Sequence, residues 1–311
     1  MIKRSIGIPR ALLYYKYGTF WIKFFDNLGC KIVVSPETNK DIITKGINLA
    51  VDESCLSVKI YLGHVDWLSK RVDYIFIPHF EHLYPCEEIC VKFMGLNDIV
   101  RNIFPSIKII EYTVDEIGYK KEWLHMIILG TALTYNPVKS VRAYLDATKE
   151  YKKEKENRFK SQFRKIENRD KSKPLILIVS HPYTTYDNFL GRPISDFLER
   201  QGVDIIYSDI IDNNLARSLS SKIAKDLYWT FHKELIGAVE FYKEYVDGII
   251  FLMTFPCGPD SLMINLCQIK LKDIPSALIT LDELQAEVGL RTRLESFIDI
   301  LKIRIKCKQE E

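Results

Sequence analysis

The feature that most constrains the fold is a repeated unit in which an apolar run ends in a polar or Pro/Gly turn and a helix-like segment follows. PLILIVSHP (174–182) precedes a segment with helical spacing through Ile194 and Phe197, and VDGIIFLMTFPCGPD (246–260) precedes SLMINLCQ (261–268). Apolar runs of this kind are typical of strands buried on both faces of a parallel sheet. The unit therefore predicts repeated βα connections in this half of the chain.

The first half repeats the same alternation. SIGIPRALL (5–13) predicts a strand and a turn at Pro9, and apolar residues at helical spacing predict a helix from Ala11 to Leu28. Gly29 suits the C-terminal cap of that helix. Further strands are expected at KIVVSP, VDYIFIPHF and SIKIIEYTV, and helices at residues 41–49 and from about 55 to 68.

These patterns predict an α/β protein with two Rossmann-like or flavodoxin-like parallel-sheet domains, a helical connection and a cleft between the domains. A length of 311 residues agrees with about two domains. We expect an N-terminal α/β domain over 1–119, a helical, basic linker region over 120–172, and a C-terminal α/β domain over 173–311. GVDIIYSD and IPSALITLD supply further strands of the last domain, and RTRLESFIDILK its last helix.

Composition narrows the class of protein. The chain is 47% hydrophobic and 27% charged, as in ordinary globular proteins. No apolar stretch approaches the roughly 18 to 20 residues of a membrane span, and the N-terminus lacks the apolar run of a signal peptide. Seven cysteines without a compact framework fit a reducing compartment, so a cytoplasmic location is expected. A net charge of +3 gives no argument for nucleic acid.

Charge is concentrated in one segment. Residues 148–173 contain 11 Lys/Arg and 5 Asp/Glu, a local balance of +6, which leaves −3 for the other residues. Glu and Lys at i,i+3 and i,i+4 spacing indicate a solvated helix that joins two domains. The alternative interpretation is a docking surface for an acidic partner protein.

Three cysteines lie in separate segments, each beside turn-forming or polar residues: Cys55 in VDESCLSVK, Cys90 in CEEICVKFMG and Cys257 in MTFPCGPDSL. Each is expected where a strand has ended or a helix begins, and open α/β sheets assemble sites from distant loops at that edge. Thiolates bind iron–sulfur clusters, zinc or copper(I). CEEIC also meets the spacing of a zinc knuckle, so a structural zinc protein stays an alternative.

The other four cysteines are interpreted differently. Cys86 is a possible fourth ligand, a ligand to a second metal cluster, or a surface thiol. Cys30, Cys267 and Cys307 fit the role of ordinary thiols, because free cysteine is among the residues most often buried in proteins. Three protein thiolates on a four-iron cluster would leave one iron open to water or substrate.

Seven segments together resemble the acyl-CoA dehydratase activase-related proteins, relatives of the electron-accepting component of 2-hydroxyacyl-CoA dehydratases. They run in order along nearly the whole chain: IGIPRALLYYKYGTFWIKFFDNLGCKIVVSPETN, ESCLSVKIYLGHVDWL, DYIFIPHF, ICVKFMGLNDIV, LYWTFHKELIGAV, CGPDSLM and DELQAEVGLRTRLESFID. The resemblance implies a 4Fe-4S cluster on Cys55, Cys90 and Cys257 that receives low-potential electrons from an ATP-hydrolysing activase partner.

The chain departs from the family pattern at two positions. The family usually has proline two residues after its first cluster cysteine and immediately after its second, where this chain has Ser57 and Val91. Those prolines shape the loops and are not ligands, so the departure bears on loop geometry more than on ligation. No Walker motif is present, so the chain resembles the component that receives electrons and not the one that hydrolyses ATP.

Three functions therefore stay open, and whether the chain is itself a dehydratase- or reductase-like enzyme is uncertain. The first is an iron–sulfur component that reduces, or passes electrons to, a small or CoA-linked substrate in anaerobic metabolism. The second is a non-catalytic cluster-binding or scaffold subunit, including one of an 8Fe-9S double-cubane cluster, completed by a second dehydratase-like subunit or as a homodimer. The third is the structural zinc protein.

Several polar residues accompany the cysteines. Lys59, one helical turn after Cys55, is a candidate hydrogen-bond donor to a cluster sulfide, with an ordinary solvated lysine as the alternative. His64 is interpreted as a packing or capping residue, and Asp260 with Ser261 as helix-start caps. Functional and structural roles are equally open for His181, Tyr183 and Tyr186. The same holds for Glu283, Arg291 and Arg293, which suit either the phosphate of a CoA ester or internal ion pairs.

Overall fold

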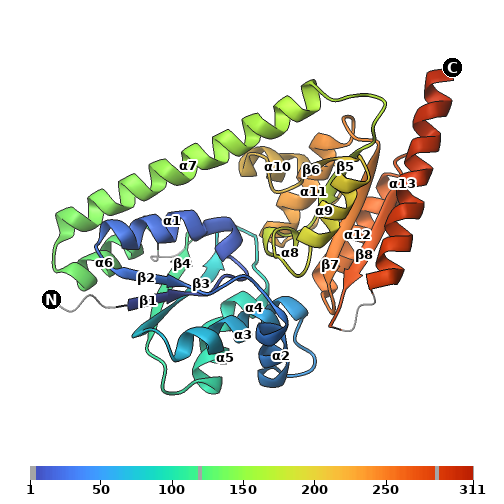
Figure 1. Cartoon of the computed structure of the whole chain (residues 1–311). Helices are drawn as coiled ribbons and strands as arrows, with labels where there is room; N and C mark the ends of the chain where they lie inside the picture. Colours follow the sequence, from blue (N-terminus) through green and yellow to red (C-terminus); the bar gives the residue numbers. More distant parts are fainter. Residues whose placement is uncertain (1–4, 118–120, 284–286, 311) are drawn as a thin grey trace. The chain divides into compact units, whose positions relative to one another are not determined.

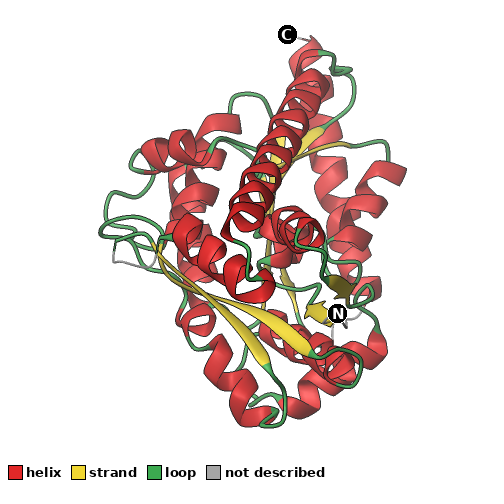
Figure 2. Ribbon diagram, turned by 90° about the vertical axis from the view of Figure 1, so that its left-hand side faces the viewer, coloured by secondary structure: helices red, strands yellow, loops and turns green. Residues whose placement is uncertain are grey.

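A computed structural model describes residues 5–117, 121–283 and 287–310 of the chain (Figure 1). The chain divides into two compact units, each described separately below. The N-terminal unit comprises residues 1–156 with 228–230, and the C-terminal unit comprises residues 157–227 with 231–311. Each unit contains a four-stranded parallel sheet surrounded by helices (Figure 2), which confirms the predicted α/β class.

The sheet of the N-terminal unit has the strand order β2-β1-β3-β4, with every pair parallel. Its elements follow the predicted alternation closely. In chain order they are β1 (Ser5–Ile8), α1 (Tyr14–Asn27), β2 (Lys31–Val34), α2 (Lys40–Leu49), α3 (Leu56–Ser69), β3 (Tyr74–His82), α4 (Val91–Met94), α5 (Leu96–Ile103), β4 (Ile109–Asp115) and α6 (Glu122–Thr134).

Aromatic side chains form the core between α1 and this sheet. Phe25 of α1 meets Phe76 of β3 edge to face at 5.1 Å between ring centroids, and Phe76 stacks on Tyr112 of β4 at 5.8 Å. Trp21 contacts Phe76 as well, at 5.2 Å. Such ring pairs contribute about 0.5–1.5 kcal/mol beyond the area they bury. They fix the position of β3, the strand that leads to the Cys90 loop.

The C-terminal unit has the equivalent strand order β6-β5-β7-β8, again entirely parallel. Every residue of β5 and β7 is buried, as the continuous apolar runs predict. In chain order the elements are β5 (Leu175–Val179), α8 (Pro182–Thr185), α9 (Arg192–Arg200), β6 (Asp204–Tyr207), α10 (Asn213–Ser220), α11 (Thr230–Tyr242), β7 (Gly248–Thr254), α12 (Gly258–Lys270), β8 (Ser276–Leu281) and α13 (Glu287–Glu310).

The helical, basic linker region expected over residues 120–172 contains two helices. α6 ends where Tyr135 adopts a left-handed backbone conformation with φ of 55°. Pro137 then starts α7 (Pro137–Glu167), where its missing N–H group costs no hydrogen bond. Gln162 of α7 hydrogen-bonds both the N–H (2.8 Å) and the carbonyl (3.0 Å) of Tyr207, which attaches the end of this basic helix to β6.

The order 2-1-3-4 in each sheet has a topological switch point between the first and third strands of that sheet. This point lies between β1 and β3 in one unit and between β5 and β7 in the other. Connections leave the two strands in opposite directions there, so the carboxyl edge opens into a crevice where doubly wound proteins bind ligands.

α2 and α3 approach each other unusually closely through two glycines. A Cβ atom on Gly46 would overlap the carbonyl oxygen of Lys59, and one on Gly63 would overlap that of Ile42. Residues Leu56–Val65 of α3 are all buried. The position of α3, and of the cysteine at its beginning, therefore depends on this glycine-mediated contact.

We expect Gly46→Ala to destabilise the chain by about 1–3 kcal/mol, because the obstructing atoms belong to the backbone and cannot move aside. Higher helix propensity of alanine offsets less than about 1 kcal/mol of this cost. Gly289→Ala, at a helical position with nothing within 4 Å, is the matched control and should be neutral or slightly stabilising. Urea unfolding measures both, and equal stability of the two variants would contradict the interpretation.

His64 lies on α3 and is fully buried, with its Nε2 3.0 Å from the Thr38 hydroxyl. Burial, aided by the nearby charge of Arg10, lowers the pKa of His64 to about 3. The imidazole is therefore neutral at pH 7. This geometry agrees with the predicted packing role.

A pH dependence of stability follows. The unfolded chain protonates His64 near pH 6.5 while the folded chain resists protonation to about pH 3. The contribution of His64 to the free energy of unfolding is thus fully present above pH 6.5. It falls as pH decreases, by about 2 kcal/mol between pH 7 and 5. His64→Gln should remove that slope, whereas His125→Gln, a half-exposed control, should keep it. Urea titrations at pH 7, 6 and 5 measure the free energy of unfolding of each variant. If it depends on pH in His64→Gln as it does in the wild-type chain, the assignment to His64 is refuted.

Candidate functional site

All three predicted cluster cysteines occupy the N-cap position of a helix. Cys55 precedes α3, Cys90 precedes α4 and Cys257 precedes α12. Each is partly exposed. The first turn of an α-helix presents N–H groups and carries a positive partial charge. At the N-termini of the longer helices α3 and α12, this charge favours a thiolate or another anion. All three cysteines thus stand immediately before the first residue of a helix.

The parallel topology also determines which sheet edge these cysteines approach. α3 leads directly into β3 and runs back along it, so its N-terminus with Cys55 lies toward the carboxyl edge of the N-terminal sheet. Cys90 follows β3 at that same edge. In the C-terminal unit, Cys257 follows β7 after a Phe255–Pro256 turn. Each unit thus carries its predicted ligands at the edge where ligand loops are expected.

Backbone hydrogen bonds hold the loop that carries Cys90. Glu88 N–H donates to the carbonyl of Tyr228 at 2.8 Å, and Thr230 N–H donates to the carbonyl of Glu88 at 3.0 Å. Cys86, in the same loop, is exposed and has a left-handed backbone with φ of 58°. Its role as a ligand stays a prediction.

Lys59 is buried, with 5% of its surface exposed, one helical turn after Cys55. A fully buried lysine is rare unless it has a partner. The solvated lysine considered as the alternative is therefore excluded. Its role toward a cluster stays a prediction.

The remaining cysteines occupy ordinary positions. Cys267 is buried within α12, and burial raises the pKa of its thiol to about 12. Cys30 is partly exposed between α1 and β2, and Cys307 is exposed near the end of α13.

A second group of possible ligands lies in the C-terminal unit, where His181, His232 and Asp260 converge. His181 Nε2 lies 3.0 Å and His232 Nε2 2.8 Å from the same oxygen, Asp260 Oδ1. The imidazole rings are nearly perpendicular, with centroids 4.9 Å apart. Each of the three residues is 4% exposed. Tyr183 stacks on the outer face of His181 at 5.0 Å.

The electrostatics of this group favour an anionic aspartate. Burial acts to raise the pKa of Asp260, but the two histidines beside it outweigh that effect and hold the pKa well below its usual range. Desolvation lowers the pKa of His232 despite its hydrogen bond with Asp260.

This arrangement corrects the expected role of Asp260 and adds His232 to the site residues. Asp260 was expected to cap α12, yet Cys257 occupies the cap position and Asp260 binds the two histidines. His232 was not predicted as a site residue, because it lies inside α11, away from any strand end. Of the tyrosines considered with His181, Tyr186 donates a 2.6 Å hydrogen bond to Asp209, which also binds Arg158 at 3.0 Å.

The N-terminal unit contains another set of possible ligands: Glu81, His82 and Asp115, at the ends of β3 and β4. These residues are only partly buried. His82 Nδ1 lies 3.3 Å from Asp115 Oδ1, and His82 Nε2 lies 3.7 Å from Glu88.

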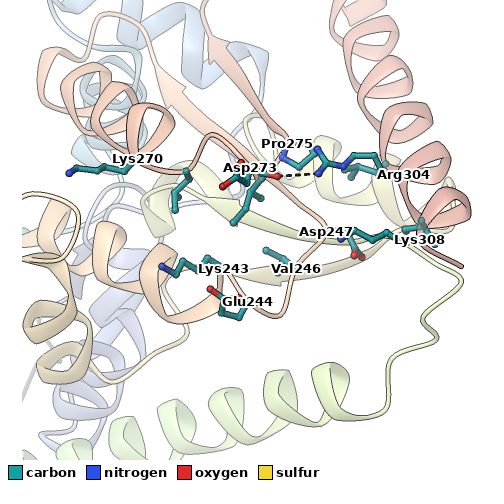
Figure 3. Close-up of a pocket in the computed structure, with 13 residues that line it drawn as sticks. Lys243, Glu244, Val246, Asp247, Lys270, Asp273, Pro275, Arg304 and Lys308 are labelled. Atoms are coloured by element: carbon teal, nitrogen blue, oxygen red, sulfur yellow. Dashed lines mark hydrogen bonds between the residues drawn. The ribbon is translucent and has the colours of Figure 1, made fainter. Parts of the chain in front are cut away.

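A pocket of about 410 Å³ lies at the opposite, amino edge of the C-terminal sheet (Figure 3). Arg304 donates to the carbonyl of Asp273 at 3.2 Å there. Asp247 accepts hydrogen bonds from Arg169 at 3.1 Å and from the Leu175 N–H at 2.9 Å. The Asp247 carboxylate thus holds the segment after α7 against the start of β5, which is a structural role.

Of the residues considered for a CoA phosphate, Arg293 donates to the carbonyl of Leu278 at 2.7 Å, which attaches α13 to β8. Glu283 N–H donates to Asp282 at 2.7 Å. Residues 284–286 of the same segment lie outside the described residues.

Comparisons with known structures give only distant likenesses. A periplasmic metal-binding protein from Candidatus Liberibacter asiaticus is 13% identical, with a TM-score of 0.30, and the match covers 96% of this chain and 100% of that one. The periplasmic zinc-binding protein TroA from Treponema pallidum is 9% identical, with a TM-score of 0.26, over 97% and 99% of the two chains. Likenesses this weak carry no inference about the site. No curated protein gives a significant match.

Among the described residues, no helix has both the length and the apolar character needed to cross a membrane.

One comparison is decisive for the family. Residues 5–211, two thirds of the chain, match the family model described as the CoA enzyme activase uncharacterised domain. The chain belongs to this CoA enzyme activase-related family.

Proposed function

We propose that the chain is an iron–sulfur component that binds a 4Fe-4S cluster through Cys55, Cys90 and Cys257 and works with an ATP-hydrolysing activase. Family membership supports the link to CoA-enzyme activation. The observation that carries the cluster proposal is the N-cap position of all three cysteines. Thiolates are the usual ligands of iron–sulfur clusters.

The donor set of these residues fits such a group. Soft sulfur donors select iron–sulfur clusters, zinc or copper(I) over hard cations. The positive ends of α3 and α12 stabilise the negative charge of thiolates and of a sulfide-bearing cluster. A bound cluster would supply a low-potential acceptor for electrons and, with three protein ligands, an iron open to substrate.

In this function the protein would bind the cluster and adjust its reduction potential. The N-cap cysteines bind the group, and the loop held by Glu88 orients Cys90. Lys59 places a buried side chain one turn after Cys55, where its charge would favour the reduced form of a cluster. Electrons received from the activase would pass to a CoA-linked or another hard-to-reduce substrate.

Anaerobic purification followed by iron, sulfide and zinc analysis tests the proposal. We expect about four iron and four sulfide per chain, with broad visible absorption that bleaches on reduction. About eight iron per chain would support the double-cubane alternative. Stoichiometric zinc without visible absorption, or no metal after anaerobic reconstitution, would overturn the cluster assignment.

Serine substitutions at Cys55, Cys90 and Cys257 should each lower iron and sulfide to below about one per chain, because serine removes the soft donor. Serine is itself a preferred N-cap residue, so the folds of α3 and α12 should survive. Cys307→Ser, at an exposed position, is the matched control and should keep the wild-type content. Cys86→Ser distinguishes a fourth ligand, which would lose iron, from a surface thiol. Full iron and sulfide content in all three N-cap variants would refute the ligand set.

Lys59→Met should make the midpoint potential of the cluster more negative, since a buried positive charge stabilises the reduced and more negative state. Lys45→Met is the control, because Lys45 lies on the exposed face of α2 and pairs with Asp41 at 2.9 Å. Redox titration followed by EPR measures both potentials. A shift of equal size in the two variants would mean that Lys59 has no specific role.

A further inference from the structure

We propose that His181, His232 and Asp260 form a mononuclear site for a divalent first-row transition metal, separate from the cysteine ligands. Two imidazole nitrogens and one carboxylate oxygen come from three elements: the end of β5, the helix α11 and the first turn of α12. Imidazole with carboxylate is a donor set that binds iron(II), zinc, nickel and related ions.

The donor distances favour octahedral over tetrahedral coordination. Ligand atoms about 2.1 Å from a metal are about 3.0 Å apart when they subtend 90°, and about 3.4 Å apart at the tetrahedral angle. The two nitrogen-to-oxygen separations are 2.8 and 3.0 Å. Each separation fits two adjacent corners of an octahedron, with Asp260 Oδ1 common to both pairs. Two histidines and one carboxylate on one face, with the other corners open, are typical of non-haem iron(II) sites.

The surroundings of the group also suit a metal. All three side chains are 4% exposed, so a cation there would be shielded from bulk water. Tyr183 stacks on His181 and restrains the orientation of its ring. The Ser180 hydroxyl, next to His181, is buried and has no hydrogen-bond partner among the described residues. This unpaired hydroxyl belongs to the segment between β5 and His181.

The position within the fold gives an independent argument. His181 follows β5 and Asp260 follows β7, and these neighbouring strands flank the topological switch point of the C-terminal sheet. Doubly wound sheets bind cofactors in the crevice at this point. By contrast, Glu81, His82 and Asp115 lie at the ends of β3 and β4, a strand pair that does not flank the switch point of its sheet, and they are more exposed.

The test uses the full chain with Cys55, Cys90 and Cys257 all replaced by serine, so that thiolates do not compete for the probe. Cobalt(II) is titrated anaerobically, with binding followed by equilibrium dialysis and visible absorption. We expect about one cobalt per chain, with the weak absorption of octahedral nitrogen and oxygen coordination. In the wild-type chain, iron(II) should compete for the same position.

Ligand variants locate the bound ion. His181→Gln and His232→Gln should each abolish stoichiometric binding, whereas His82→Gln, in the other group of possible ligands, should leave it unchanged. Unaltered far-UV circular dichroism confirms that each variant is folded.

Three outcomes would overturn the proposal. They are no stoichiometric cobalt in either the serine variant or the wild-type chain, retention of binding in both histidine variants, and loss of binding in His82→Gln. The first would mean that Asp260 serves only as a hydrogen-bond acceptor for two histidines. This test is independent of the cluster proposal, because sulfide content reports the cluster and cobalt binding in the serine variant reports the histidine site.

Discussion

Parallel strand pairing is the constraint on which the rest of each unit depends. A parallel strand can be followed by a neighbour only after the chain returns along the sheet, so the returning helices start at the carboxyl edge. The strand ends and the helix N-termini therefore gather at one side of each sheet. In one unit Cys55 and Cys90 reach that side although they are 35 residues apart in the chain. In the other unit His181 reaches it with Cys257 and Asp260, although His181 and Asp260 are 79 residues apart.

Close packing then turns this placement into a fixed geometry. α3 carries Cys55 at its start and is buried along most of its length, and the two glycine contacts with α2 leave it no room to shift. The buried side chain of Lys59 belongs to the same helix, one turn away. Rigid elements of this kind hold site residues more accurately than mobile loops do.

The sequence predicted the elements whose signals are local and missed what depends on tertiary contacts. Strands β5 and β7 were predicted because each contains a continuous apolar run, and α1 because its apolar residues recur at helical spacing. α4 and α8 have four residues each, too few to show a period. Asp260 was interpreted as a cap because it follows Cys257 at an expected helix start, where aspartate is a preferred capping residue. Only the fold brings His181 and His232 into contact with Asp260. The residues next to His232 in the sequence do not indicate this contact.

The first turn of α12 joins the two proposed chemistries. Cys257 is its N-cap and Asp260 lies three residues later, so one helix start carries a soft sulfur donor and a hard oxygen donor. The two donors select different metal groups, because soft thiolates bind iron–sulfur clusters while the harder imidazole and carboxylate donors bind single divalent ions. The positive end of the helix favours both anionic groups. A displacement of α12 would move both donors together, which makes its packing against β7 a shared requirement of the two sites.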